Sequence, residues 1–198
     1  MKMDRTEDPK KVFSLDVVSV KLNPEFKLFS NEPIETPNDV ALAACRLLED
    51  NDREMIIVFN LRSDGRPASC HIAGIGTIDS CMAHPRELIK STILSNASSM
   101  VIAHNHPSGS LDASNHDIDL TDRMIKVCNL MQIRFLDHII VAGGERGKYI
   151  SMFEKGIIEK TPQGLMQVAE EYKPYVAEGR NDYGLHSYEG RDYESKVR

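Results

Sequence analysis

The feature that most constrains this chain is a short strand-like run that ends in two histidines and leads into a long helical pattern. Residues 98–106 read SSMVIAHNH, and the turn PSGSLDA separates them from SNHDIDLTDRMIKVCNLMQI. Successive side chains of a strand point to opposite faces, so a strand that continues to residue 106 projects His104 and His106 to the same side. Asp117 follows one turn inside the helix, on the face that can look back at the histidines. The sequence therefore predicts that these three side chains meet.

Two imidazoles and one carboxylate form the kind of three-ligand set that holds a catalytic zinc ion and leaves a fourth position for water. Zn²⁺ is favoured over Mg²⁺ because nitrogen ligands suit the softer ion. Structural interpretations stand beside this one: Ser114 and Asp117 resemble a helix capping box, and a histidine pair at a strand end can be a simple hydrogen-bonded pair. Each element alone favours a structural role, but the whole spacing, His-x-His-x7-Ser-x2-Asp, favours a metal site.

The remaining patterning predicts an α/β domain with a mixed β-sheet flanked by helices. Helical spacing of apolar residues occupies 36–50, 85–96 and 114–133, and the third of these helices is expected to bury Ile118, Met124, Ile125 and Cys128. The first helix has Thr36 or Asn38 as candidate N-cap. Strand patterns occupy EMIIVFNL and ASCHIAGIGT, joined by the turn-rich RSDGRP, and FLDHIIVAGGERGKYISM reads as two strands joined by a glycine-rich turn.

Three zones are expected along the chain. Residues 1–35 form an N-terminal arm with one strand, DVVSVKL; residues 36–160 form the regular domain; and residues 161–198 hold a short helix, LMQVAEEYKPYV, followed by a polar tail that lacks aliphatic residues to bury. Each boundary coincides with a change from periodic apolar patterning to polar or proline-containing sequence.

Composition narrows the function classes. The 198 residues are 41% hydrophobic and 27% charged, which is typical of a soluble globular protein. Four cysteines without a Cys-x-x-Cys pair indicate thiols in a reducing compartment. No apolar run has the length of a membrane span or a signal peptide, so we expect a cytoplasmic protein without a membrane partner. A net charge of −6 gives no support to a nucleic-acid partner.

The spacing of the histidines, Ser114 and Asp117 is the JAMM signature of the JAB/MPN metallopeptidase-like superfamily. Residues 76–109 (GTIDSCMAHPRELIKSTILSNASSMVIAHNHPSG) and 136–152 (LDHIIVAGGERGKYISM) resemble the JAB domain of the RadC family more closely. The resemblance covers about residues 14–160. It implies the JAB/MPN fold, whose architecture is similar to that of cytidine deaminases, with zinc at the edge of the sheet. Full-length RadC proteins carry a helix-hairpin-helix region for which there is no room here, so the chain resembles the shorter branch.

The resemblance also implies a general base and an oxyanion-stabilising group. The JAMM pattern supplies a glutamate at the start of a core strand, which corresponds to Glu54 before MIIVFNL; Glu87 in HPREL is the rival carboxylate. The same pattern gives Ser114 a hydroxyl that steadies the tetrahedral oxyanion or the attacking water. The mechanism implied is hydrolysis by metal-activated water, with Glu54 accepting the proton.

Three functions remain open at this point. The first is a JAMM-type zinc hydrolase, peptidase-like or isopeptidase-like, with a protein or peptide substrate. The second is a RadC-like protein associated with DNA repair, either a nuclease or an accessory factor, and the third is a non-catalytic JAB binding module. His138 is expected to hydrogen-bond near the site, and His116 to be exposed. The GGERGK segment is interpreted as a hairpin turn, and the sequence does not determine the oligomeric state.

Overall fold

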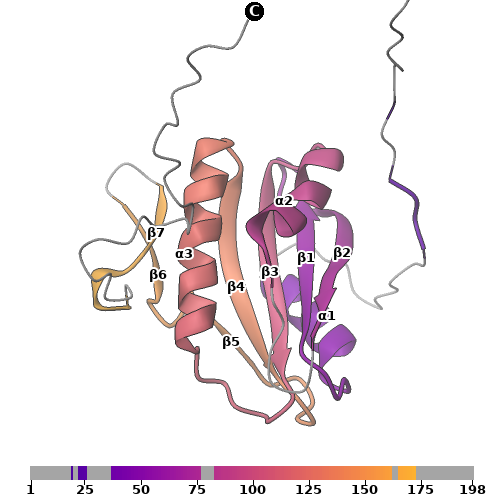
Figure 1. Cartoon of the computed structure of the whole chain (residues 1–198), viewed down its shortest axis with the longest axis vertical. Coiled ribbons are helices and arrows are strands. Elements are labelled where there is room, and N and C mark those ends of the chain that lie inside the picture. Colours follow the sequence, from indigo (N-terminus) through magenta and orange to yellow (C-terminus); the bar gives the residue numbers. More distant parts are fainter. Residues whose placement is uncertain (1–18, 20–21, 26–36, 77–82, 162–164, 173–198) are drawn as a thin grey trace, which may run out of the picture.

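The computed structural model describes residues 19, 22–25, 37–76, 83–161 and 165–172, and they build a five-stranded mixed sheet with helices on both faces (Figure 1). The strand order is β2-β1-β3-β4-β5. Only β3 and β4 pair in parallel; the other neighbouring strands of this sheet are antiparallel. The strands are β1 (Met55–Leu61), β2 (Pro67–Ile75), β3 (Ser99–His106), β4 (Arg134–Ala142) and β5 (Tyr149–Ser151).

The helices are α1 (Pro37–Leu48), α2 (Pro85–Leu94) and α3 (Asn115–Leu130). They divide the interior into two cores. Alternate residues of β3 serve opposite faces: Val101 and Ala103 pack with α1, whereas Met100 and Ile102 pack with α2 and α3. His104 lies on the same face of β3 as Met100 and Ile102, so its imidazole projects to the α3 side of the sheet.

The predicted elements of the central domain are confirmed. The hairpin of β1 and β2, the continuation of β3 through both histidines, and the glycine-rich connection from β4 to β5 are all present. The predicted apolar face of α3 is buried, as Ile118, Met124, Ile125 and Cys128 show. The N-cap assignment to Asn38 is wrong, because Asn38 lies within α1. The alternative cap, Thr36, lies outside the described residues.

A second, two-stranded sheet was not predicted. It pairs β6 (Ile158–Lys160) with β7 (Met166–Val168) in antiparallel fashion. The helix expected over residues 165–176 is wrong in its described part, where β7 is followed by a single 3₁₀ turn, Glu170–Tyr172. Tertiary packing is the physical reason: Met166 and Val168 are buried in the core against α3, and the segment pairs with β6.

The predictions for the two ends of the chain fall mostly outside the described residues. Of the expected strand DVVSVKL the structure describes only Ser19 and Leu22, and neither is in a strand. The expected polar tail beyond Tyr172 lies outside the described residues as well. Within the described part of the chain, no helix has the length and apolar character to cross a bilayer.

Candidate metal centre

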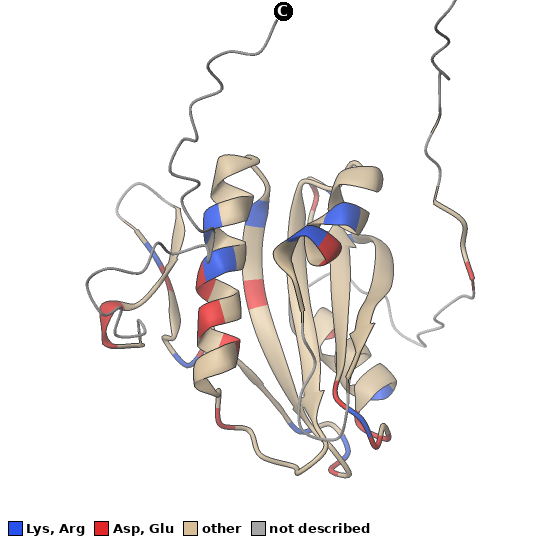
Figure 2. Ribbon diagram, in the orientation of Figure 1, with Lys and Arg blue, Asp and Glu red and all other residues tan. Residues whose placement is uncertain are grey.

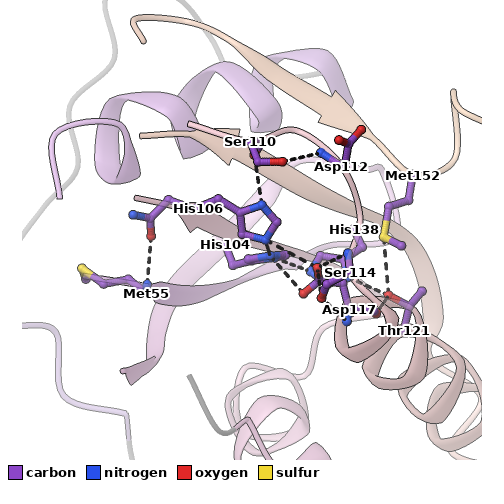
Figure 3. Close-up of polar contacts among 11 residues, drawn as sticks. Met55, His104, His106, Ser110, Asp112, Ser114, Asp117, Thr121, His138 and Met152 are labelled. Carbon is purple, nitrogen blue, oxygen red and sulfur yellow. Dashed lines mark hydrogen bonds and ion pairs between the residues drawn. The ribbon is translucent and has the colours of Figure 1, made fainter. Parts of the chain in front are cut away.

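Three side chains from two elements converge where β3 ends and α3 begins (Figure 3). His104 and His106 lie at the end of β3, and Asp117 lies in the first turn of α3. The two Nε2 atoms are 3.0 Å apart. Asp117 Oδ1 is 3.1 Å from His104 Nε2, and Oδ2 is 3.5 Å from His106 Nε2. One potential ligand atom from each residue lies within 4.8 Å of the others, so the predicted triad forms a group that could hold a metal ion.

The start of α3 holds the carboxylate of Asp117 in place. Ser114 is the N-cap, and its hydroxyl accepts from the Asp117 N–H while its own N–H donates to Asp117 Oδ2 at 2.8 Å. The Ser114 hydroxyl also lies 2.6 Å from Oδ2. The capping box and the metal-site interpretation are therefore both satisfied by the same two residues. Because Oδ2 is engaged by Ser114, Oδ1 is the oxygen left to face His104.

Asp117 is ionised in this environment. Burial works to raise the pKa of its carboxyl, but the adjacent side chains of His104, His106 and Ser114 outweigh it and hold the pKa well below the usual range. The position in the first turn adds to this effect, because the positive end of the helix dipole favours an anion there. A negatively charged ligand is thus available beside both imidazoles.

His106 presents Nε2 to the centre because its other nitrogen is occupied. Nδ1 lies 3.0 Å from the carbonyl oxygen of Ser110, which can only accept, so Nδ1 carries the proton. The hydrogen bond to Asp117 raises the pKa of His106, although burial opposes the shift. In the absence of a cation, a proton on Nε2 would satisfy the facing carboxylate, and a metal ion would take the place of that proton.

A third histidine, His138, hydrogen-bonds the ring nitrogen of His104 that does not face Asp117. His104 Nδ1 lies 2.8 Å from Nε2 of His138, which is fully buried on β4. Nδ1 of His138 in turn lies 2.6 Å from the hydroxyl of Thr121 on α3. The prediction that His138 hydrogen-bonds near the site is confirmed. Thr121 was not predicted, because a threonine inside a helix carries no signal in the sequence.

The backbone after His106 is fixed by two glycines. The carbonyl oxygen of His106 accepts from the N–H groups of Gly109 and Gly143, each at 2.9 Å. Gly109 has φ of +79°, a left-handed conformation that favours glycine. Gly143 is required for close approach: a Cβ there would lie 2.8 Å from both the His106 oxygen and the Pro107 Cα. The GGERGK segment is the predicted hairpin turn, and its first glycine packs directly against the end of β3, which carries both histidines.

Glu54, the predicted base, precedes β1 and is half-buried. Ile56 pairs with His104 in antiparallel register, and an extension of that register by two residues would place Glu54 opposite His106. Its negative charge is close enough to contribute to the raised pKa of His106, after the larger effect of Asp117. The rival Glu87 lies on α2 and is engaged by Lys90 Nζ at 2.6 Å. These contacts favour Glu54 over Glu87 as the carboxylate that serves the centre.

A buried asparagine, Asn105, joins the segment around Glu54 to β3 by hydrogen bonds. Asn105 is fully buried between the two histidines, and its amide oxygen accepts from the Met55 N–H at 2.8 Å. Its amide nitrogen donates to the Arg53 carbonyl at 3.0 Å. These bonds bracket Glu54 on both sides. Sequence reasoning missed this role, and the only signal was a polar residue near the end of an otherwise apolar strand.

The donor set fits a divalent first-row metal ion. Ligands 2.0–2.2 Å from one tetrahedral ion lie about 3.3–3.6 Å from one another. The two Nε2 atoms are 3.0 Å apart, and the two oxygens of Asp117 lie 3.1 and 3.5 Å from them, which is close to that range. Two imidazoles and an ionised carboxylate at one point would repel one another without a cation or proton between them. His116 is exposed and is not part of the converging group, as predicted.

Comparisons with known proteins identify the family of the chain. A sequence model of the family described as RadC-like JAB domain matches residues 34–157. The chain belongs to this family. A UPF0758 protein from Haemophilus ducreyi is 38% identical over 124 residues, which make up 63% of this chain and 54% of the relative. The chain therefore matches about half of that relative's length. The residues matched by the family model include all three converging residues and Glu54.

Proposed function

We propose that this RadC-like JAB domain protein is a zinc-dependent hydrolase of the JAMM type, acting on peptide or isopeptide bonds. The observation that carries the proposal is the convergence of His104, His106 and Asp117, with both Nε2 atoms and a carboxylate oxygen directed to one point. Two imidazole nitrogens and one carboxylate oxygen suit Zn²⁺ better than hard ions such as Mg²⁺, which prefer oxygen ligands only. Three protein ligands leave the fourth coordination position open, as in catalytic zinc sites.

Zinc held by these three residues would supply Lewis acidity and lower the pKa of water toward neutrality. The chain's own residues complete the reaction. A carboxylate oxygen of Glu54 accepts the proton of the attacking water and later delivers it to the leaving nitrogen. The segment carrying Glu54 is held by Asn105, so the base is tied by hydrogen bonds to the strand that carries both histidines.

Ser114 has two roles in this proposal. Its hydroxyl orients Asp117 through the contact with Oδ2 at 2.6 Å. Ser114 is an exposed residue, which supports the proposal that a substrate carbonyl oxygen can approach it. A hydroxyl that turns from Asp117 to the developing oxyanion would stabilise the tetrahedral transition state. Membership of a metallopeptidase-like superfamily supports an acyl carbon, rather than phosphorus, as the centre attacked.

The charge distribution favours a protein or peptide substrate over nucleic acid. The chain carries a net charge of −6. Figure 2 shows acidic and basic residues mixed along α3, with no continuous basic stripe on the described ribbon. A nucleic-acid-binding surface gathers Lys and Arg because phosphate contacts supply most of its affinity.

Metal analysis combined with a cleavage screen tests the proposal. The purified protein should carry about one zinc ion per chain, as expected for a mononuclear site. It should hydrolyse members of a peptide and isopeptide panel, and the His104→Ala/His106→Ala double variant should lose both metal and activity. Cleavage confined to a parallel panel of single- and double-stranded DNA would overturn the substrate class. Full zinc content in the double variant would overturn the site.

A further inference from the structure

A chain of four buried polar groups runs from the metal centre into the protein. His104 Nδ1 lies 2.8 Å from His138 Nε2, and His138 Nδ1 lies 2.6 Å from Thr121 Oγ1. Thr121 Oγ1 then lies 2.6 Å from the backbone carbonyl oxygen of Asp117. His104 is 2% exposed, and His138 and Thr121 are completely buried. Each of these polar groups must therefore find its hydrogen-bond partner within the protein, because bulk water does not reach it.

The hydrogen bond between Thr121 and the Asp117 carbonyl determines which group donates in every other hydrogen bond of this series. A carbonyl oxygen has no proton, and two oxygens 2.6 Å apart repel unless a proton lies between them. The Thr121 hydroxyl has the single proton available, so it donates to the Asp117 carbonyl. Its oxygen is then an acceptor toward His138. The sulfur of Met152 is a second neighbour of this hydroxyl at 3.5 Å, but a thioether is a weak acceptor and the contact is longer.

The tautomers of both histidines follow from this order of donors and acceptors. His138 is completely buried and, among the described residues, no carboxylate lies against its ring. Burial of an unpaired charge is costly, so the ring is neutral. A neutral ring that donates from Nδ1 to Thr121 has a lone pair at Nε2. That lone pair accepts from His104 Nδ1–H, which leaves the Nε2 lone pair of His104 directed at Asp117 and His106. This tautomer is the one that can bind a metal ion.

We propose that Thr121 is a positioning residue, which acts through His138 to hold His104 in its metal-binding tautomer. The inference rests on the proposed metal centre and deepens it. Thr121 lies one helical turn after Asp117, so one turn of α3 supplies a ligand and also fixes the protonation of another. A threonine hydroxyl often bonds the carbonyl four residues earlier for local reasons alone, and only the added contact with His138 gives this one a role at the centre.

Replacement of Thr121 by valine keeps the shape and removes the hydroxyl. The buried Nδ1–H of His138 then has no acceptor, and the tautomer with its proton on Nε2 becomes competitive. That proton would face His104 Nδ1 and drive the His104 proton to Nε2, where the metal binds. Thr121→Ser restores the hydroxyl and serves as the matched control.

The probe is zinc alone, measured by competition with a chromogenic chelator on the full chain. Thr121→Val should weaken zinc affinity by about 10- to 100-fold, the range for loss of an outer partner of a ligating histidine, while Thr121→Ser stays close to wild type. Urea denaturation of the metal-free variants checks that both are folded. Wild-type zinc affinity in folded Thr121→Val would overturn the inference.

A second measurement needs no variant. Nitrogen-15 NMR of the histidine rings in the metal-free wild-type protein reports which nitrogen carries the proton. A proton on Nδ1 of His138 is expected, and a proton on its Nε2 would overturn the inference even if Thr121→Val failed to fold. If the wild-type protein binds no zinc, the metal centre itself fails, whereas the NMR result still decides the tautomer.

Discussion

Substitution of Gly143 by alanine should weaken zinc binding, although Gly143 is not itself one of the candidate ligands. The N–H of Gly143 donates to the carbonyl oxygen of His106 at 2.9 Å. An added Cβ would lie 2.8 Å from that oxygen and from Pro107 Cα, and 3.1 Å from the Pro107 oxygen. All three atoms belong to the backbone, so no side chain can rotate away to relieve the contact.

The magnitude follows from the geometry. Ordinary van der Waals contact begins at 3.4 Å, so the backbone at residues 106 and 107 must retreat by about 0.6 Å, the difference between 3.4 and 2.8 Å. Metal sites tolerate ligand displacements of only about 0.2 Å. We therefore expect a loss of zinc affinity of about 10- to 100-fold, comparable to the loss of an outer-shell partner.

Chelator competition on the folded variant measures this effect, and Gly147→Ala is the control. Gly147 lies in the same turn with φ of +68° and has no atom within 4 Å of an added Cβ. Alanine there costs about 1–2 kcal/mol of left-handed strain but leaves His106 in place, so stability should fall and zinc affinity should not. Equal zinc affinity in Gly143→Ala and wild type, with both folded, would refute the reasoning.

The other predictions concern the ligands, the base and pH. His104→Ala and His106→Ala should each abolish zinc binding measured by metal analysis, because two ligands cannot hold the ion. Glu54→Gln should keep zinc content and folding while lowering turnover on any substrate found by roughly 100-fold or more; full activity would pass the role to another group. Burial raises the pKa of Asp137 to about 6 from 3.8, so the unfolded chain loses this proton at lower pH than the folded chain. The unfolding free energy of the metal-free protein should therefore fall as pH rises from about 4 to about 6, and Asp137→Asn should reduce that slope in urea titrations at several pH values.

The centre was predictable because its geometry is local. Strand alternation puts His104 and His106 on one face, and an N-cap serine three residues before Asp117 fixes where the helix begins. These rules operate within a few residues and need no knowledge of tertiary packing. The same holds for the hairpin of β1 and β2, whose turn residues identify it directly.

The parts that were missed depend on distant contacts. Thr121 and Asn105 gain their roles only from partners that lie 17 and 50 residues away in the chain, His138 and Met55. The sequence around β7 predicts a helix wrongly because the three residues of the strand are too few to show a period. The strand is decided by pairing with β6 and by burial against α3, and tertiary context of this kind overrides local propensity.

The two faces of β3 carry different parts of the candidate centre. The even-numbered His104 and His106 face α3 and the converging carboxylate, while Asn105 between them faces the other side and binds the backbone on both sides of Glu54. A shift of β3 by one residue would exchange these faces and separate ligands from base together. If the proposed function holds, the register of β3 against β1, with Ile56 opposite His104, therefore governs how the base is placed relative to the metal ligands. Selection for the reaction would then act on the packing of β1 against β3 as strongly as on the ligands themselves.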